Sequence, residues 1–144
     1  MKTNTKYANM HNKNLGFNAE SIARKWYEKR GWTLANQNSR TRNSELDLVM
    51  YKNIEGSNST EYLFVEVKSL EVGKGVNKDN LKPEDNFTKA KQKMFRRGIE
   101  QYLAKNSLYP KVLRTDLACV YHNLDSLGVA GEWSIKVYDN MILE

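Results

Sequence analysis

The sequence predicts a single α/β domain built around a mixed β-sheet, and three observations lead to this prediction. Apolar residues follow helical spacing in two long segments, one near the N-terminus and one in the second half of the chain. Short runs between and after these segments alternate or concentrate apolar residues as strands do. The chain of 144 residues is long enough for one hydrophobic core, and it contains no linker or internal repeat.

The composition excludes several classes of protein. Hydrophobic residues make up 40% and charged residues 28%, which is typical of a globular protein and not of a disordered chain. The net charge of +6 favours a polyanionic partner, although a protein with a merely basic face has the same charge. Residues 1–14 resemble a frayed tail and not a secretory signal, so residues 15–144 are expected to form the folded domain.

Membrane spans, disulfides and histidine-based metal sites are not expected. No apolar run reaches the roughly 20 residues that cross a bilayer. The one cysteine, Cys119, forms no intrachain disulfide and is expected to be a buried strand residue, which suits a cytoplasmic protein. His11 and His122 match no metal-ligand spacing.

The first helix is predicted from Gly16 to Arg30. Apolar residues at helical spacing form its buried stripe, and Gly31 suits its C-terminal end. Glu20 lies on the flank of this stripe. It is either a helix-dipole acid that pairs with Arg24 one turn later, or an acid directed at a site.

Five strands are expected in the remainder of the chain, and the third is apolar enough to be central and covered on both faces. Their predicted bounds are Trp32–Gln37, Glu45–Tyr51, Tyr62–Val67, Val112–Tyr121 and Trp133–Tyr138. Polar or glycine-containing connections are expected at Asn38–Ser44, Asn53–Glu61 and Leu70–Asp85. The last of these connections is expected to be a loop beside the site.

The second long helix is predicted from Phe87 to Asn106. Its buried stripe is expected to contain Phe87, Ala90, Met94, Gly98, Ile99, Tyr102 and Leu103. The first half of this helix is strongly basic, which indicates either a solvated face or a phosphate-binding face. The candidate phosphate-binding residues are Lys91, Lys93, Arg96 and Arg97, together with Arg40 and Arg42 of the first predicted turn.

Carboxylates placed in two apolar strands are the candidate functional groups. Asp47 lies in one strand, and Glu66 and Lys68 share a face of the next, because side chains alternate along a strand. A hairpin can place Asp47 beside Glu66, and two adjacent carboxylates repel each other unless a cation neutralises them. Such a pair suits Mg²⁺ (or Mn²⁺), with the backbone carbonyl of Val67 as a further oxygen ligand.

Lys68, which lies beside these two acids in the sequence pattern, is compatible with two different roles. Its amine can orient or deprotonate an attacking water, or stabilise charge that develops on a phosphate. The acids, the cation and the lysine would then form a site for phosphodiester hydrolysis. Alternatively, Lys68 simply pairs with Glu66 or Asp47 on the surface of the sheet.

A wider pattern of motifs extends over about residues 14 to 121. Its segments, in chain order, are Gly16–Ala23, Glu45–Val49, Phe64–Lys68, Lys91–Gln92, Tyr102–Leu103 and Arg114–Asp116. The pattern resembles the YraN-like family of small bacterial proteins, which is related to archaeal Holliday junction resolvases within the PD-(D/E)XK nuclease superfamily. The chain departs from the family pattern where Ala19 and Ser44 replace glycines and Leu70 replaces an arginine.

The resemblance implies a restriction-endonuclease-like αβββαβ core with α/β/α layers. The residues that it implies to act are the metal-side acids Glu20, Asp47 and Glu66, the catalytic Lys68, and the auxiliary Gln92 or Lys91. It therefore favours the interpretation of Glu20 as an acid directed at the site. By analogy with junction resolvases, which cut a four-way junction at two symmetric positions, it also implies a homodimer.

Three functions follow as hypotheses. The first is a Mg²⁺-dependent endonuclease that hydrolyses DNA phosphodiester bonds, with branched or junction DNA as an expected substrate and the basic residues neutralising phosphates. The second is a non-catalytic nucleic-acid-binding module that retains the nuclease fold. The third is an interaction protein that binds no nucleic acid and no divalent cation.

Overall fold

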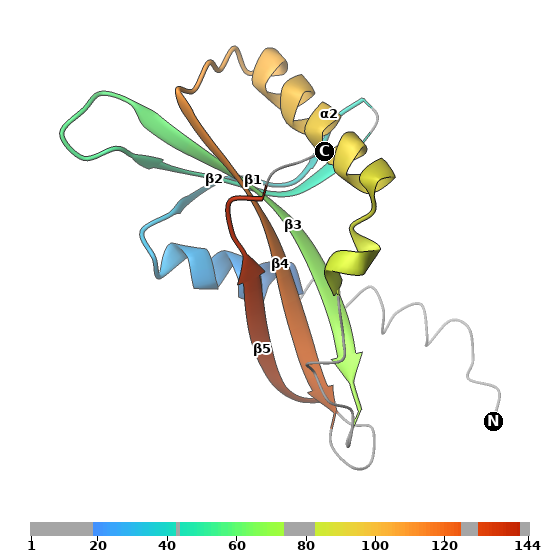
Figure 1. The fold of residues 1–144 in the computed structure, drawn as a ribbon. Coiled ribbons are helices and arrows are strands. Elements are labelled where there is room, and N and C mark those ends of the chain that lie inside the picture. Colours follow the sequence, from blue (N-terminus) through green and yellow to red (C-terminus); the bar gives the residue numbers. More distant parts are fainter. Residues whose placement is uncertain (1–18, 43, 74–82, 125–129, 142–144) are drawn as a thin grey trace.

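A computed structural model describes residues 19–42, 44–73, 83–124 and 130–141 (Figure 1). The described part contains one mixed five-stranded sheet and two helices, as expected for the α/β class. Its elements are a first helix over residues 19–28, β1 (Thr33–Arg40), β2 (Glu45–Asn53), β3 (Thr60–Val72), the 3₁₀ turn η2 (Pro83–Asn86), α2 (Lys89–Lys105), β4 (Val112–Leu124) and β5 (Ala130–Tyr138). The expected tail, residues 1–14, lies outside the described residues.

The strands lie in the sheet in the order in which they occur in the sequence. β1, β2 and β3 form an antiparallel meander, and β5 pairs antiparallel with β4. β3 and β4 are parallel, and α2 lies in the connection that this arrangement requires. The first helix and α2 contribute to two separate apolar clusters, so each helix covers a different face of the sheet.

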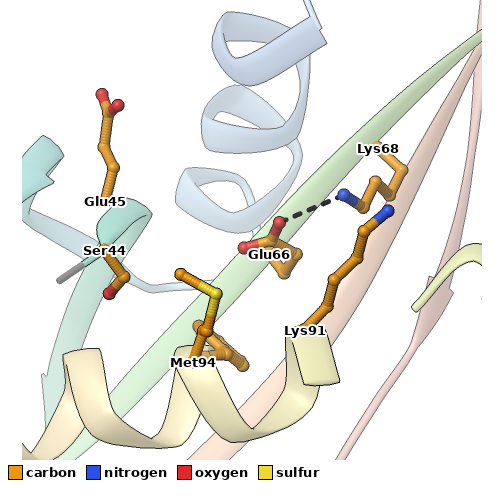
Figure 2. A pocket seen from close by; sticks show the side chains of 7 residues that line it. Ser44, Glu45, Glu66, Lys68, Lys91 and Met94 are labelled. Carbon is orange, nitrogen blue, oxygen red and sulfur yellow. Dashed lines mark ion pairs between the residues drawn. The ribbon is translucent and has the colours of Figure 1, made fainter. Parts of the chain in front are cut away.

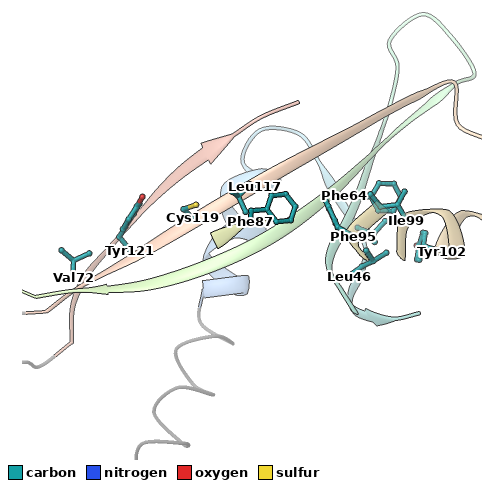
Figure 3. Packing of buried hydrophobic residues seen from close by; sticks show 11 residues of the cluster. Leu46, Phe64, Val72, Phe87, Phe95, Ile99, Tyr102, Leu117, Cys119 and Tyr121 are labelled. Atoms are coloured by element: carbon teal, nitrogen blue, oxygen red, sulfur yellow. The ribbon is translucent and has the colours of Figure 1, made fainter. Parts of the chain in front are cut away.

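The two clusters divide the core of the protein. On the α2 face, Phe64 packs edge-to-face against Tyr102, with ring centroids 5.8 Å apart, and Figure 3 shows this cluster extending along β3 and β4. On the other face, Ala23 and Tyr27 of the first helix are fully buried against the sheet. Cys119 is buried on the α2 face, as expected from its apolar run.

The buried stripe of α2 differs from the prediction. Met94 is 49% exposed and Ala90 is also exposed, whereas Phe95, which was not predicted, is buried and packs against Phe87. Positions 94 and 95 both lie within one turn of the buried Gly98, so helical spacing alone does not decide between them. The larger aromatic side chain is the one that fills the core.

All five strands are longer than predicted, and the extensions of β1 and β3 change the expected connections. β1 continues to Arg40 through part of the expected turn, although Asn38 within the strand takes a left-handed φ of 52°. β3 continues to Val72, which is 5% exposed, so the expected loop does not begin at Leu70. The section of that loop over residues 74–82 lies outside the described residues.

Asp116 ties three parts of the fold together. It is 1% exposed and accepts hydrogen bonds from the hydroxyl of Tyr27 (2.7 Å), the guanidinium of Arg114 (3.0 Å) and the backbone N–H of Asn140 (3.0 Å). Buried charge is tolerated when it is paired and hydrogen-bonded in this way. The Arg114–Asp116 pair is therefore structural. Within the described residues, no helix is both long enough and apolar enough to span a bilayer.

Candidate functional site

β2 and β3 stop pairing next to Asp47. Their last paired residues are Leu48 and Val65, so Asp47 and Glu66 occupy facing positions one step beyond the end of the ladder. The Asp47 side chain there accepts the backbone N–H of Val67 over 2.8 Å. A carboxylate thus takes the place of the missing ladder bond, and the strands separate around it.

The face of the sheet on which the even-numbered side chains of β2 lie also changes at Asp47. Leu48 belongs to the cluster on the first-helix face, whereas Leu46, two residues earlier, belongs to the cluster on the α2 face. Residues two apart on a regular strand share a face, so the alternation is broken at Asp47. Its side chain is consequently directed at the edge of β3 and not at either core.

Glu66 and Lys68 lie on the α2 face of β3, where they line a hollow of about 230 Å³ with Ser44, Glu45, Lys91, Met94 and Phe95. The Lys68 amine is 3.4 Å from the Glu66 carboxylate, and both side chains are partly exposed. Figure 2 shows Lys68 and Lys91 reaching toward the same space from β3 and α2, whereas Glu45 points away from them. Lys68, Lys91 and Glu66 therefore bring two cations and a carboxylate to the hollow, and Glu45 also belongs to its lining.

Burial and mutual repulsion raise the pKa values of the acids next to this hollow. Desolvation and the charge of Asp47 raise the pKa of Glu66 to about 7, against the opposing effect of Lys68 and Lys91. Desolvation raises the pKa of Asp47 to about 6, although the Val67 N–H and Lys68 oppose the shift. A bound cation would remove this repulsion, so the pair is chemically suited to one.

Glu20 approaches Asp47 from the first helix. Desolvation and then the charge of Asp47 raise the pKa of Glu20 to about 7, and hydrogen bonds from the side chains of Asn38 and Gln37 oppose the shift. Arg24, the alternative partner of Glu20, lies 3.3 Å from Glu28 instead. Glu20 is thus placed with the strand acids.

The donor set fits a hard divalent cation at Asp47 and Glu66. Carboxylate oxygens are preferred by Mg²⁺ and Mn²⁺, and Mg²⁺ is commonly held by one or two carboxylates with water and phosphate oxygens as its other ligands. No three His, Cys, Asp or Glu side chains of the described residues are grouped closely enough to hold one ion together. Glu20 therefore lies near Asp47 and Glu66 but is not grouped with them as a third ligand of one ion.

Other residues predicted for the site do not line the hollow, or make contacts different from those predicted. The Gln92 amide donates to the backbone oxygen of Phe87 (2.8 Å) at the start of α2, so Lys91, not Gln92, lines the hollow. Val67 contributes its N–H to Asp47, and a role for its carbonyl remains a prediction. The other basic candidates, Arg40, Arg42, Lys93, Arg96 and Arg97, are exposed.

At least one of these basic residues, Arg96, lies away from the site. Arg96 lines a different hollow, with Leu113 and Met141, on the far side of α2 from Lys91. Arg40 and Arg42 lie at the β1–β2 turn, which leads to Ser44 at the rim of the site. The turn therefore lies next to the hollow at Ser44, whereas Arg96 lines a different hollow.

Sequence reasoning missed four residues of the hollow: Ser44, Glu45, Met94 and Phe95. Gly98, a glycine in the middle of α2, was the sequence signal that could have indicated Ser44. A Cβ at Gly98 would collide with Ser44 Oγ and lie 3.1 Å from Leu46 Cδ2, so the glycine lets α2 approach the start of β2.

Comparison with known proteins gives a consistent result at the level of the family. A family model described as "Uncharacterised protein family UPF0102" matches residues 19–120. Among curated proteins, a UPF0102 protein of Clostridium perfringens strain SM101 is 28% identical over 116 residues, which cover 81% of this chain and 86% of the relative. A UPF0102 protein of Clostridium perfringens strain 13 is 27% identical over the same shares of both chains.

Proposed function

The chain belongs to the uncharacterised protein family UPF0102, the YraN-like family, and we propose that it is a divalent-metal-dependent endonuclease that hydrolyses DNA phosphodiester bonds. One observation supports this above the others. Asp47 and Glu66 are partly buried, mutually repelling carboxylates at the point where β2 and β3 separate, and the amine of Lys68 lies 3.4 Å from Glu66. Perturbed carboxyl groups beside a lysine in a hollow are a recurring feature of catalytic sites.

The order of elements also supports the proposal. A helix with Glu20, the meander with Asp47 and Glu66, the helix α2 and the parallel strand β4 follow one another as in the αβββαβ core of the PD-(D/E)XK superfamily. We take the specific restriction-endonuclease-like arrangement as part of the proposal, because a fold alone does not establish a function.

Each group of the site has a proposed role. Mg²⁺ held by Asp47 and Glu66 would neutralise charge on the phosphate oxygens and lower the pKa of a bound water. The Lys68 amine orients the attacking water or stabilises the charge that develops on the phosphate. Lys91 offers a second cation on the opposite wall of the same hollow.

The substrate is proposed to be nucleic acid, with branched or junction DNA cut by a homodimer. The net charge of +6 and the exposed arginines at the β1–β2 turn favour a polyanion. Arg40 and Arg42 would contact phosphates beside the hollow without reading base sequence.

The proposal is tested by cleavage of labelled DNA. The full chain is incubated with a four-way junction, a linear duplex and a single strand of matched sequence, with Mg²⁺, Mn²⁺ or EDTA. We expect metal-dependent cutting that falls by at least about 100-fold in Asp47→Asn and Lys68→Met, since each removes a charge at the reacting phosphate. Asp139→Asn and Lys105→Met, which change exposed groups outside the hollow, are the matched controls.

Three other outcomes have distinct meanings. Cutting that survives in both Asp47→Asn and Lys68→Met shows that the assigned site is wrong. Binding that weakens steeply with salt, with no cutting of any substrate, indicates the non-catalytic module. A chain that neither binds nor cuts any of these substrates favours the third hypothesis, an interaction protein.

A further inference from the structure

Tyr109 is the most exposed of the large apolar side chains in the described part of the chain. The residue is 89% exposed, compared with 49% for Met94 and 41% for Val112. It lies in the connection between α2 and β4. A single exposed apolar side chain is ordinary on a protein surface, so the groups around Tyr109 decide whether its ring is a binding group.

Those groups form a hollow of about 280 Å³ between this connection and the β2–β3 turn (Figure 1), which we call the Tyr109 hollow. Tyr62 and Tyr109 line it together with Lys111, which is exposed, and with the polar residues Asn58 and Thr60. None of the described residues that line it carries a carboxylate. The hollow therefore combines flat aromatic surface, an amine and several hydrogen-bonding groups.

Both walls of the Tyr109 hollow are held by backbone hydrogen bonds. In the β2–β3 turn, the N–H of Ile54 donates to the oxygen of Ser59 over 2.9 Å. In the connection after α2, the N–H of Leu108 donates to the oxygen of Leu103 over 2.9 Å. The parallel pairing of β3 with β4 begins directly beyond both walls. The hollow is thus formed without a ligand, so binding requires little ordering of the chain.

A nucleobase is the flat ligand that suits this hollow. Bases stack on aromatic side chains, and because every base has a π-face, stacking tolerates any sequence. The amine of Lys111 suits the phosphate that adjoins the base, and the hydroxyl and amide groups suit the base edge. The faces of paired bases are hidden inside a duplex, so only an unpaired base can enter.

A second hollow also borders Tyr109 but has different chemistry. It measures about 500 Å³ and shares Leu108, Tyr109 and Pro110 with the first. Its lining includes the apolar Leu103 and the acidic Glu100. A carboxylate repels a phosphate, and apolar walls are typical of protein contacts. The nucleobase is therefore assigned to the Tyr109 hollow and not to this one.

The Tyr109 hollow and the hollow beside Lys68 lie toward different ends of α2. The latter is lined by Lys91 and Phe95 in the N-terminal half of α2, whereas Tyr109 follows the C-terminal end of the helix. α2 has 17 residues and is therefore about 25 Å long. One nucleotide cannot reach both hollows, whereas a strand of several nucleotides can.

We propose that the Tyr109 hollow binds an unpaired nucleobase of the nucleic-acid substrate, which stacks on the Tyr109 ring while Lys111 contacts the adjoining phosphate. The inference extends the proposed function and rests on it for the class of ligand. It requires neither a bound cation nor cleavage, so it is tested in EDTA.

Binding is measured by fluorescence anisotropy of labelled oligothymidylate with the full chain. We expect Tyr109→Ala to weaken binding by about 10-fold, because it removes one stacking contact, and Tyr109→Phe to bind as the wild type does. Val112→Ala is the matched control, because Val112 is also exposed but does not line the hollow. On a blunt duplex, Tyr109→Ala should bind as the wild type does.

The phosphate contact is tested by the salt dependence of the same binding. Lys111→Gln should reduce the slope of log affinity against log salt by about 0.7, the value for one phosphate of a single strand. Lys105→Gln changes an exposed lysine that does not line the hollow and should leave the slope unchanged. An unchanged slope in Lys111→Gln overturns the assignment of Lys111.

The stacking contact is tested by photochemical cross-linking. Oligothymidylate that carries iodouracil is irradiated with the full chain in EDTA, and the modified peptide is identified by mass spectrometry. We expect an adduct on Tyr109 that is lost in Tyr109→Ala. Adducts confined to other residues overturn the inference.

The results separate the two proposals. Unchanged affinity of Tyr109→Ala for oligothymidylate overturns the nucleobase site, and cutting that depends on Asp47 and Lys68 then leaves the proposed function standing. A Tyr109→Ala variant that alters sedimentation of the free protein, but not its affinity for DNA, shows that the ring contacts a second copy instead. A wild-type chain that does not bind oligothymidylate overturns the inference, whatever the chain cuts.

Discussion

The backbone N–H of Val67 donates to the carboxylate of Asp47 over 2.8 Å, one step beyond the last rung that joins β2 to β3. This bond lets the two strands part without leaving a buried donor unpaired. It also fixes Asp47 opposite Glu66, so the separation of the strands and the position of the acids have one common cause.

Two substitutions of Asp47 should separate the contribution of its hydrogen bond with the Val67 N–H from that of its charge. Asp47→Asn keeps a side-chain acceptor for the Val67 N–H, whereas Asp47→Ala leaves that donor without a partner. We expect Asp47→Ala to be less stable than Asp47→Asn by about 1–3 kcal/mol in urea unfolding, because an unpaired buried donor keeps its desolvation cost. Equal stability of the two variants would show that the bond contributes nothing to the fold.

Stability of the metal-free protein should fall as the pH rises. The pKa values of Glu20 and Glu66 are raised to about 7 and that of Asp47 to about 6, so the folded chain binds these protons more tightly than the unfolded chain does. The stabilisation is complete below the unfolded values near 4 and is lost as the pH passes 6 to 7. Thermal unfolding in EDTA should therefore show a higher Tm at pH 5 than at pH 8.

Two measurements check that these acids cause the effect. Glu66→Gln should make the dependence of Tm on pH shallower, since it removes one group with a raised pKa. Mg²⁺ should raise Tm at pH 8 and have little effect at pH 5, where the ligands are protonated. A Tm that rises from pH 5 to pH 8 in EDTA would contradict the prediction.

Lys91 and Gln92 should differ in what they support, although they are neighbours in the sequence. Lys91 lowers the pKa of Glu66 across the hollow, whereas the Gln92 amide is bonded to the oxygen of Phe87. We expect Lys91→Met to reduce cleavage by about 10-fold or more through loss of a charge beside the phosphate. Gln92→Ala should mainly cost stability, about 0.5–1.5 kcal/mol, and the opposite ranking in cleavage assays would reinstate Gln92 as the auxiliary group.

Gly98 should not tolerate alanine, despite lying in a helix. The added Cβ would collide with Ser44 Oγ, which is 3.0 Å from the Thr41 hydroxyl, and would press on Leu46. We expect Gly98→Ala to lose about 1–3 kcal/mol to crowding, partly offset by a gain of up to about 1 kcal/mol in helix propensity.

A double-mutant cycle tests the origin of that loss. Ser44→Ala removes the hydroxyl that the new Cβ meets, so the Gly98→Ala/Ser44→Ala pair should recover part of the stability. Strictly additive effects in urea unfolding would show that the crowding comes from Leu46 alone.

The sequence was sufficient to predict the order of the elements and the facing positions of Asp47 and Glu66. Alternating and apolar runs identified the strands, and a hairpin register between β2 and β3 puts these two acids opposite each other. The placement of Glu20 near them came from the motif pattern and not from spacing, which is equally compatible with a pair to Arg24.

Other features depend on tertiary geometry that local patterns do not contain. A left-handed asparagine inside a strand has the same sequence signal as one in a turn, so β1 was predicted to end before Asn38. The reversal of β2 at Asp47 leaves the hydrophobic pattern intact, because Leu46 and Leu48 are both buried, only on opposite faces. The choice between Met94 and Phe95 likewise depends on the volume left between α2 and the sheet.

The parallel pairing of β3 with β4 also determines the order in which the chain folds. β1, β2 and β3 close through short local hairpins, whereas β4 joins β3 across about 50 residues. Long-range pairing carries a larger loop-closure cost and forms later. Substitutions of Asp47, whose contact with Val67 forms early, are therefore expected to slow refolding, while those of Asp116 on β4 mainly speed unfolding, so the acids that define the site meet before the strand that completes the sheet has docked.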